Sequence, residues 1–459
     1  MPGVRPPSVD AVLRAAEAGL DGRHQGAVRA VAREVIAEER FALAGGSTGS
    51  SASELAATVL RRLRDLDGAA PDAGSAGLQR AINATGVVLH TNLGRAAWPR
   101  AAIEAAAAAA AAPSLLELDR LTGRRGRRFG AVEDEVIELT GAEAALVTNN
   151  NAAAVALAVG LAGRGGVAVS RGELVEIGGG VRIPEVVRRA GARLVEVGTT
   201  NRTRVADFEA VLADGRARMV LRVHPSNFAQ TGFVESPDAG EVADVAHRHG
   251  AIVVDDLGSG ALLDTARFGL THEPMPRERL EAGVDLVTFS GDKLVGGPQA
   301  GIIAGRTELV ERLRKDPLAR AMRPDKVVLA ALAATLRLYR AGTVTTEIPI
   351  WRQIATPLDA LERRAQALTT TVVSGDKRAI VRAAPTVSTI GGGSLPGQTL
   401  PSWSVSIDGP APQRLLERLR EGPTPVIGRI VDDAVVLDLR TVEPDDDSRL
   451  ADTILAAIG

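Results

Sequence analysis

From about residue 130 onward, short runs of apolar and β-branched residues alternate with segments whose apolar residues recur at helical spacing. The runs that predict strands are 145–149, 166–170, 192–197, 218–223, 251–255 and 285–290. Such alternation predicts an α/β fold with a mainly parallel sheet and helices on both faces. Ligands bind such sheets beyond the carboxyl ends of the strands, so the residues that follow each run are the first candidates for a site.

The pattern changes on either side of this alternating region. Residues 1–77 predict a small helical N-terminal domain, with linkers of small residues at 44–53 and 67–77. Residues 78–345 are expected to form a large domain around the predicted sheet. Residues 346–459 predict a smaller C-terminal α/β domain.

Composition excludes several kinds of chemistry. The 459 residues include no cysteine, which excludes disulfides, thiolate nucleophiles and cysteine-ligated metals. The six histidines form no HExxH motif, so we expect no metal site. The net charge of −2 argues against a surface covered with nucleic-acid-binding charge. Neither a signal-peptide pattern nor an apolar run of the roughly 18 residues that span a membrane is found, so we expect a cytoplasmic protein.

Only four of the 54 basic residues are lysines, so chemistry that needs a primary amine has four candidates. Lys315, Lys326 and Lys377 lie in polar helical or loop contexts, where lysine is normally exposed. Lys293 instead follows the apolar run 285–290 and precedes a pair of glycines. A lysine fixed in such a turn, with a lowered pKa, is suited to Schiff-base chemistry.

Two other predicted strands also end in polar residues. Residues 149–151 are three asparagines that open a helix, where free N–H groups can bind an anion, although one asparagine would suffice as an ordinary N-cap. Asp255 and Asp256 end another run, where either could face a cofactor or cap a turn. A phosphate-binding helix start, an acid and a downstream lysine together are what pyridoxal 5'-phosphate requires. Nucleotide-binding fingerprints of the GxGxxG and P-loop types are missing from the sequence.

Several long and unusual motifs carry a resemblance to a known family. They occupy residues 82–96, 121–130, 139–157, 171–186, 223–233, 256–264, 289–303 and 391–397. Through these motifs nearly the whole chain resembles the bacterial selenocysteine synthase family, L-seryl-tRNA(Sec) selenium transferase. The resemblance implies a fold-type-I transferase that depends on pyridoxal 5'-phosphate.

The resemblance also implies roles for the residues at the strand ends. Lys293 would bind the cofactor as an aldimine, and Asn150 and Asn151 would lie at its phosphate. Asp256 is favoured over Asp255 for the pyridine nitrogen, because it begins an Asp-x-small pattern common in this fold.

At another strand end, His224, Ser226 and Asn227 would line the cofactor site. For the histidine, packing in a turn is an equally good interpretation.

The implied reaction converts L-seryl-tRNA(Sec) to L-selenocysteinyl-tRNA(Sec). The serine amine would displace Lys293, which would then remove the Cα proton. Loss of the hydroxyl would give a dehydroalanyl intermediate, to which selenophosphate delivers selenium. Arg95, Arg320 and Arg323 would bind this donor, and Asp292 is a candidate proton donor to the leaving hydroxyl.

The resemblance implies that the N-terminal domain recognises the tRNA. A second candidate is the run of arginines Arg120, Arg124, Arg125, Arg127 and Arg128. An ester substrate has no α-carboxylate, so no arginine clamp for one is expected. Arg429 could contradict this expectation, unless it forms an ion pair with Asp432 or Asp433.

Two alternative functions stay open. One is a lyase of the same fold that acts on a small amino acid or an amino sugar phosphate. The other is a catalytically silent tRNA-binding protein, which the intact lysine turn argues against. Sites of this fold are normally built between subunits, so we expect at least a homodimer, and the family resemblance suggests a larger ring.

Overall fold

The computed structural model describes residues 6–20, 25–44, 49–66, 78–128, 130–177, 180–226, 228–376, 380–422 and 424–459. Contacts divide the chain into two compact units. One contains residues 1–82 and 420–425, and the other contains residues 83–419 and 426–459. All the candidate site residues named above by number belong to the second unit, and only the predicted N-terminal helical domain lies in the first.

The first unit is built on three helices, which pack their apolar faces together. They are α1 (Val9–Ala16), α2 (Gln25–Ala44) and α3 (Ala52–Leu66). Ser51 and Glu54 form a capping box, in which each side chain accepts the backbone N–H of the other residue. This cap starts α3 inside the predicted linker 44–53. The predicted linker 67–77 lies outside the described residues.

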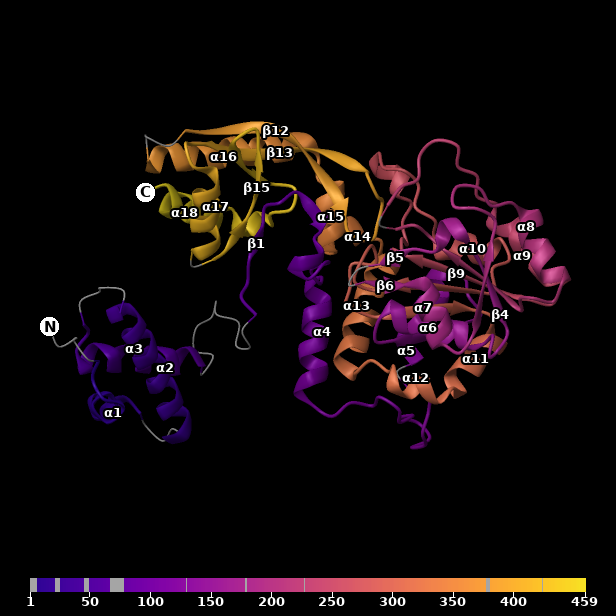
Figure 1. The fold of residues 1–459 in the computed structure, drawn as a ribbon, viewed down its shortest axis with the longest axis horizontal. Helices are drawn as coiled ribbons and strands as arrows, with labels where there is room; N and C mark the ends of the chain where they lie inside the picture. The colour runs from indigo at the N-terminus through magenta and orange to yellow at the C-terminus, as the bar shows by residue number, and fades with distance from the viewer. Residues whose placement is uncertain are drawn as a thin grey trace. The chain divides into compact units, whose positions relative to one another are not determined.

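A seven-stranded sheet forms the centre of the second unit (Figure 1). Its strands are β3 (Ala144–Thr148), β4 (Gly166–Ser170), β7 (Arg193–Val197), β8 (Met219–Val223), β9 (Ile252–Gly258), β10 (Leu286–Ser290) and β11 (Gly301–Gly305). The order is β3-β11-β10-β9-β8-β4-β7, and only β11 runs antiparallel to its neighbours. The mainly parallel α/β sheet confirms the predicted fold class, whereas β11 was not predicted.

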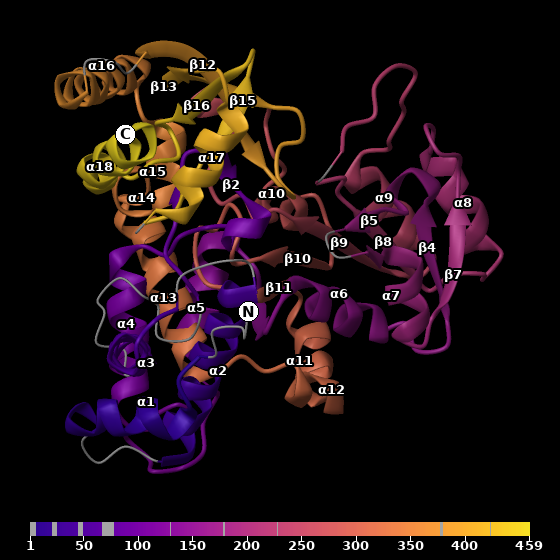
Figure 2. The same ribbon diagram turned by 60° about the vertical axis from the view of Figure 1, so that its left-hand side comes forward.

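Helices cover both faces of this sheet (Figure 2). One face packs against α5 (Gly130–Thr140), α8 (Val205–Ala213), α9 (Ala239–Arg248) and α13 (Lys326–Ala341). The other packs against α6 (Asn151–Gly160), α7 (Ile183–Arg189) and α11 (Thr307–Lys315). The strands are therefore buried on both sides, which explains their continuous apolar runs.

A second sheet of five strands lies in the C-terminal part of this unit. Its strands are β2 (Val87–Leu89), β12 (Val381–Gly391), β13 (Thr399–Asp408), β15 (Arg429–Val431) and β16 (Ala434–Asp438). The order is β15-β16-β13-β12-β2, and β2 pairs in parallel with β12. The accompanying helices are α16 (Leu358–Gly375), α17 (Pro412–Glu421) and α18 (Asp447–Ile458). Strand β2, near the N-terminal end of this unit, is thus the edge strand of a sheet whose other strands come from its C-terminal part.

The remaining helices and strands lie outside these layers. They are β1 (Ile82–Asn83), β5 (Glu176–Ile177), β6 (Val181–Arg182), β14 (Val426–Ile427), α4 (Arg100–Ala111), α10 (Pro276–Glu281), α12 (Pro317–Ala321), α14 (Val344–Glu347) and α15 (Pro349–Ala355). The alanine-rich helix α4 packs against α13. No helix in the described ranges is both long and apolar enough to cross a membrane.

Candidate active site

Lys293 lies in the connection 291–300 between β10 and β11. The turn is fixed because the Leu294 N–H donates to the Ser259 carbonyl (2.9 Å) and Trp351 Nε1 donates to the Leu294 carbonyl (2.8 Å). Lys293 is 7% exposed. Burial lowers the pKa of its amine, and the negative charge of Asp256 opposes this shift. A lysine with a lowered pKa is more often neutral, as a nucleophile or a base must be.

The other lysines do not share this environment. Lys315 is exposed at the end of α11, and half-buried Lys326 donates to the Ala112 carbonyl (2.7 Å). Lys377 lies outside the described residues. Lys293 is therefore the one buried lysine in the part of the chain that the structure describes.

Asp255 and Asp256 point to opposite faces of β9, as successive strand residues do. Asp256 accepts hydrogen bonds from Asn151 Nδ2 (2.8 Å) and Thr288 Oγ1 (2.9 Å), both on Oδ1. Burial raises the pKa of Asp256, and these two hydrogen bonds oppose the rise. Asp255 instead forms an ion pair with Arg279 (3.3 Å). Of the two acids, Asp256 is the one that joins the Lys293 site.

The first turn of α6 reaches the same site. Asn150 is an N-cap whose Oδ1 accepts the Ala153 N–H (2.9 Å), which is the ordinary capping interpretation. The amide of Asn151 turns to Asp256, and its Oδ1 is buried without a hydrogen-bond partner among the described residues. With Ala152, these asparagines line a cavity.

The cavity has a volume of about 390 Å³. Its walls come from several segments of the unit: Thr91, Arg95, Asn150, Asn151, Ala152, Val181, Ser290, Asp292, Lys293, Gln299, Gly392 and Gly393. Gly393 has φ +86°, and a Cβ at this residue would lie 2.6 Å from Lys293 Nζ. The backbone thus approaches the amine more closely than any other residue type allows. The volume is in the usual range for a cofactor site.

Two of the residues predicted after β8, His224 and Ser226, lie near the lysine. Ser226 is 4% exposed, and a Cβ at Gly258 would lie 3.6 Å from Ser226 Oγ and 3.7 Å from Lys293 Nζ. The backbone N–H of His224 donates to the Asp256 carbonyl (2.9 Å). His224 Nε2 lies 3.3 Å from Oε1 of the buried Glu273. Asn227 lies outside the described residues.

Arg95 and Asp292 face the cavity as an ion pair, with Arg95 Nη1 donating to Asp292 Oδ2 (2.8 Å). Arg95 has a left-handed backbone (φ 63°), a conformation that costs roughly 1–3 kcal/mol and is concentrated at functional sites. The predicted donor-binding arginine and the predicted proton donor are therefore in direct contact.

Arg320 and Arg323 do not line the Lys293 cavity. Arg320 is exposed on α12, and Arg323 lines a separate cavity of about 470 Å³. The Asn149 N–H donates to the Met322 carbonyl (2.8 Å), so this segment is nevertheless attached to the start of α6.

The arginine run at 120–128 is partly neutralised. Arg125 and Arg128 both bind Glu117 (2.7 Å each), and Arg127 binds Asp134 (2.8 Å). The hydrogen bond from Arg128 lowers the pKa of Glu117. Arg120 and Arg124 are exposed.

The ion-pair partner expected for Arg429 was wrong. Arg429 binds Asp438 (3.1 Å) rather than Asp432 or Asp433. Those two residues have left-handed backbones (φ 48° and 61°) in the tight turn between β15 and β16, beyond the strand that carries Arg429. Arg429 is not among the residues that line the Lys293 cavity.

Further residues of the site were not predicted, among them Thr288, Glu273 and Gly393. Thr288 had a signal, because it is a polar residue inside an apolar run. Gly393 lay in a recognised motif without an assigned role. Nothing in the sequence around Glu273 marked it as a neighbour of His224.

Comparison with known proteins gives concordant matches. The family model described as L-seryl-tRNA selenium transferase (SelA) matches residues 81–443. The L-seryl-tRNA(Sec) selenium transferase of Desulfotalea psychrophila is 45% identical over 428 residues, which cover 92% of this chain and 90% of the relative. That of Moorella thermoacetica is 45% identical over 443 residues, with coverage of 94% and 91%.

A solved structure supports the fold. D-glucosaminate-6-phosphate ammonia-lyase superposes with a TM-score of 0.58 at 21% identity, covering 83% of this chain and 96% of that one. At this identity the similarity is evidence of a shared fold alone.

Proposed function

We propose that the chain, which belongs to the L-seryl-tRNA selenium transferase family, converts L-seryl-tRNA(Sec) to L-selenocysteinyl-tRNA(Sec). Selenophosphate is the selenium donor in this reaction, and pyridoxal 5'-phosphate is the cofactor. The observation that carries the proposal is the buried amine of Lys293 in a cavity that also contains the start of α6. Family membership favours this activity over that of a small-molecule lyase.

The residues of the cavity fit the cofactor. Lys293 Nζ would bind its aldehyde carbon, and the first turn of α6 would bind its phosphate, because helix N-termini attract anions. Asp256 would face the pyridine nitrogen, since both of its hydrogen bonds engage Oδ1. The orphaned Asn151 Oδ1 and the close approach of Gly393 also suit a ligand. When bound, the cofactor serves as an electron sink for carbanion chemistry at the substrate Cα.

Lys293 is suited to carry the proton of the serine Cα. Burial lowers the pKa of the amine, so at a given pH a larger fraction is neutral and able to accept a proton. The turn held by Ser259 and Trp351 keeps the base in place during this transfer. Such positioning accounts for much of the rate enhancement of general bases.

Arg95 is the arginine best placed to bind selenophosphate near the reacting carbon. Its guanidinium retains N–H groups beyond the one bonded to Asp292, and these suit a phosphate-like anion. Asp292 then orients Arg95, and its role as proton donor to the leaving hydroxyl stays a prediction. Arg320 and Arg323 are proposed to act on the donor from the neighbouring cavity or in an assembly of at least two subunits.

The ester nature of the substrate agrees with the surroundings of Arg429. This arginine is engaged by Asp438, so its charge is already compensated. We propose that the helical N-terminal unit recognises the tRNA, and that the protein acts in the cytoplasm, where aminoacylated tRNA is found.

The direct test mixes purified protein with seryl-tRNA(Sec) and selenophosphate and measures selenocysteinyl-tRNA. The control replaces seryl-tRNA with free L-serine. Release of product from free serine, with none from seryl-tRNA, would overturn the proposal in favour of a lyase.

A further inference from the structure

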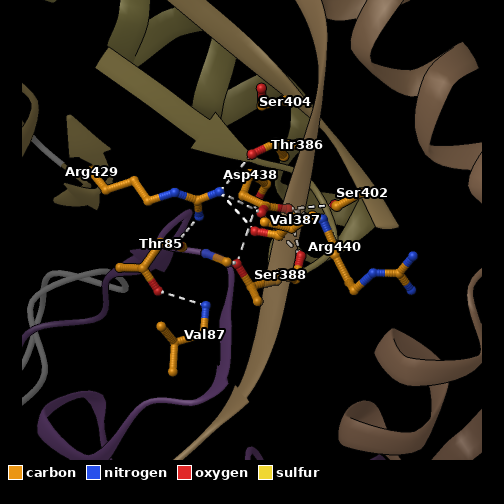
Figure 3. Close-up of polar contacts among 12 residues, drawn as sticks. Thr85, Val87, Thr386, Val387, Ser388, Ser402, Ser404, Arg429, Asp438 and Arg440 are labelled. Carbon is orange, nitrogen blue, oxygen red and sulfur yellow. Dashed lines mark hydrogen bonds and ion pairs between the residues drawn. The ribbon is translucent and has the colours of Figure 1, made fainter. Parts of the chain in front are cut away.

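A buried carboxylate outside the cavity ties several strands of the five-stranded sheet together (Figure 3). Asp438, at the end of β16, is 0% exposed. It accepts hydrogen bonds from Ser388 Oγ (3.0 Å), Ser402 Oγ (2.6 Å) and the Arg440 N–H (3.1 Å), and it forms an ion pair with Arg429 (3.1 Å). Such a charge is stable in the interior only with this many partners.

Arg429 extends the network to β2 and β12. Its guanidinium donates to the Thr85 carbonyl, to Thr386 Oγ1 (2.8 Å) and to the Val387 carbonyl (3.0 Å). Thr85 precedes the turn that begins β2, so one side chain holds the start of β2 against the middle of β12 (Figure 3). Removal of the guanidinium would leave several oxygens in this contact without a donor.

Gly86 makes this contact possible. It has φ +77°, and a Cβ at this residue would overlap Arg429 Nη1 and an oxygen of Asp438. The Gly86 N–H donates to Thr441 Oγ1 (3.1 Å), and its carbonyl accepts the Thr389 N–H (2.8 Å). The turn is therefore bound to the C-terminal sheet on both sides.

The carboxyl ends of β2 and β12 lead from this network into the Lys293 cavity. Gly391 pairs with Leu89, and the Gly392 N–H donates to the Leu89 carbonyl (3.2 Å). A Cβ at Gly392 would overlap Thr91 Oγ1, and both residues line the cavity. Gly393 follows, in contact with Lys293. Ser388, bound to Asp438, is only three residues from Gly391, about 10 Å of extended chain.

We infer that Arg429 and Asp438 are positioning residues, which fix β2 against β12 so that Gly392 and Gly393 form the cavity wall at the amine of Lys293. Neither residue lines the cavity, so both act through the strands they hold. The inference rests on the proposed function, because it takes Lys293 as the cofactor-binding lysine. Displacement of the wall by 1 Å can change such chemistry on the order of 100-fold.

Arg364 provides a matched control. It binds Asp447 through two nitrogens (2.7 and 3.0 Å) and also donates to the carbonyls of Leu439 and Val442. It thus resembles Arg429 in its carboxylate and carbonyl partners, but these partners lie after β16 and do not include β2 or β12. Loss of either arginine should destabilise the C-terminal sheet region, and only loss of Arg429 should alter the cavity.

The experiment compares Arg429→Met with Arg364→Met, using titration of each apo-protein with pyridoxal 5'-phosphate and the visible spectrum of the bound cofactor. We expect similar losses of thermal stability in the two variants. Arg429→Met should bind the cofactor roughly tenfold more weakly with a changed spectrum, and Arg364→Met within about twofold of wild type. Arg429→Lys should recover part of the cofactor affinity. In Arg429→Met, the fold decrease in kcat should exceed the fold increase in KM for seryl-tRNA.

A second variant, Gly86→Ala, covers the case in which Arg429→Met does not fold. It keeps both charges, but its Cβ would displace the side chains of Arg429 and Asp438, and it should weaken cofactor binding in the same direction. The inference would be overturned if Arg429→Met, or Gly86→Ala in its place, bound the cofactor with the same affinity and spectrum as Arg364→Met. The network would then have a purely structural role. Failure of the wild-type protein to bind the cofactor would instead overturn the proposed function.

Discussion

Replacement of Gly393 by alanine should displace the amine of Lys293 without unfolding the protein. The added Cβ would lie 2.6 Å from Nζ and 2.8 Å from Cε. Ordinary contacts between such atoms are about 3.5 Å, so the amine must move by about 1 Å. These atoms form the far end of a flexible side chain, so the movement costs little free energy. It nevertheless shifts the reacting nitrogen, which can slow its chemistry on the order of 100-fold.

Gly397 offers a matched control in the same segment. Gly393 and Gly397 have φ of 86° and 73°, so alanine at either residue meets the strain of a left-handed backbone, about 1–2 kcal/mol. No atom of the described residues lies within 4 Å of the Cβ that alanine would add at residue 397. Both variants should therefore lose about 1–2 kcal/mol in free energy of unfolding, and only Gly393→Ala should impair Lys293.

The assay is titration of each apo-protein with pyridoxal 5'-phosphate, followed by visible absorbance and by borohydride trapping of the lysine adduct. We expect Gly397→Ala to resemble wild type and Gly393→Ala to trap the cofactor roughly 100-fold more slowly. Chemical denaturation of both variants checks that their stability losses match. Equal trapping rates in the two variants would refute the reasoning, because the 2.6 Å contact would then have no effect on the amine.

Four further predictions concern the same unit and the N-terminal helices. Lys293→Ala should abolish the visible absorbance of bound cofactor, and a retained band would point to another lysine. The rate at which the apo-protein captures the cofactor should rise with pH, and the midpoint of this rise should lie below the ordinary pKa of lysine. The reason is that burial lowers the pKa of Lys293 and leaves more neutral amine at a given pH. A midpoint at or above the ordinary pKa of lysine would contradict this. Asp256→Asn should reduce kcat for product formation on the order of 100-fold. Asp255→Asn should keep the cofactor spectrum, but its free energy of unfolding should fall by about 3–5 kcal/mol because the ion pair with Arg279 is lost. Deletion of residues 1–77 should abolish tRNA binding in a filter assay and leave the cofactor absorbance intact, and unchanged tRNA affinity would refute the assigned role.

The sequence was informative wherever a local pattern decides the structure. Each predicted strand of the large sheet was found within two or three residues of its expected ends, because strands buried on both faces need continuous apolar runs. Lys293 stood out because three other lysines lie in ordinary polar contexts. The antiparallel strand β11 was missed, because the run Gly301–Gly305 is short and flanked by glycines after the turn of Lys293.

Contacts between distant residues could not be predicted. Asn151 and Asp256 are 105 residues apart, and Arg95 and Asp292 are 197 apart, so no periodicity relates them. The position of Gly393 depends on the pairing of β12 with β2, across some 300 residues of chain. The three asparagines at 149–151 were expected to bind an anion, and the structure gives two of them separate tasks: Asn150 caps α6, and Asn151 binds Asp256.

Two buried acceptor atoms near Lys293 lack a hydrogen-bond donor from the described residues. Asn151 Oδ1 and Glu273 Oε1 are buried and lack a hydrogen bond within the described ranges, and each such group costs about 1–3 kcal/mol. Asn151 binds Asp256 through its amide nitrogen, and Glu273 lies against His224. In a core selected only for stability, these groups would be replaced or paired. Their retention beside a buried amine, in a cavity of cofactor size, is what a site completed by its ligand requires.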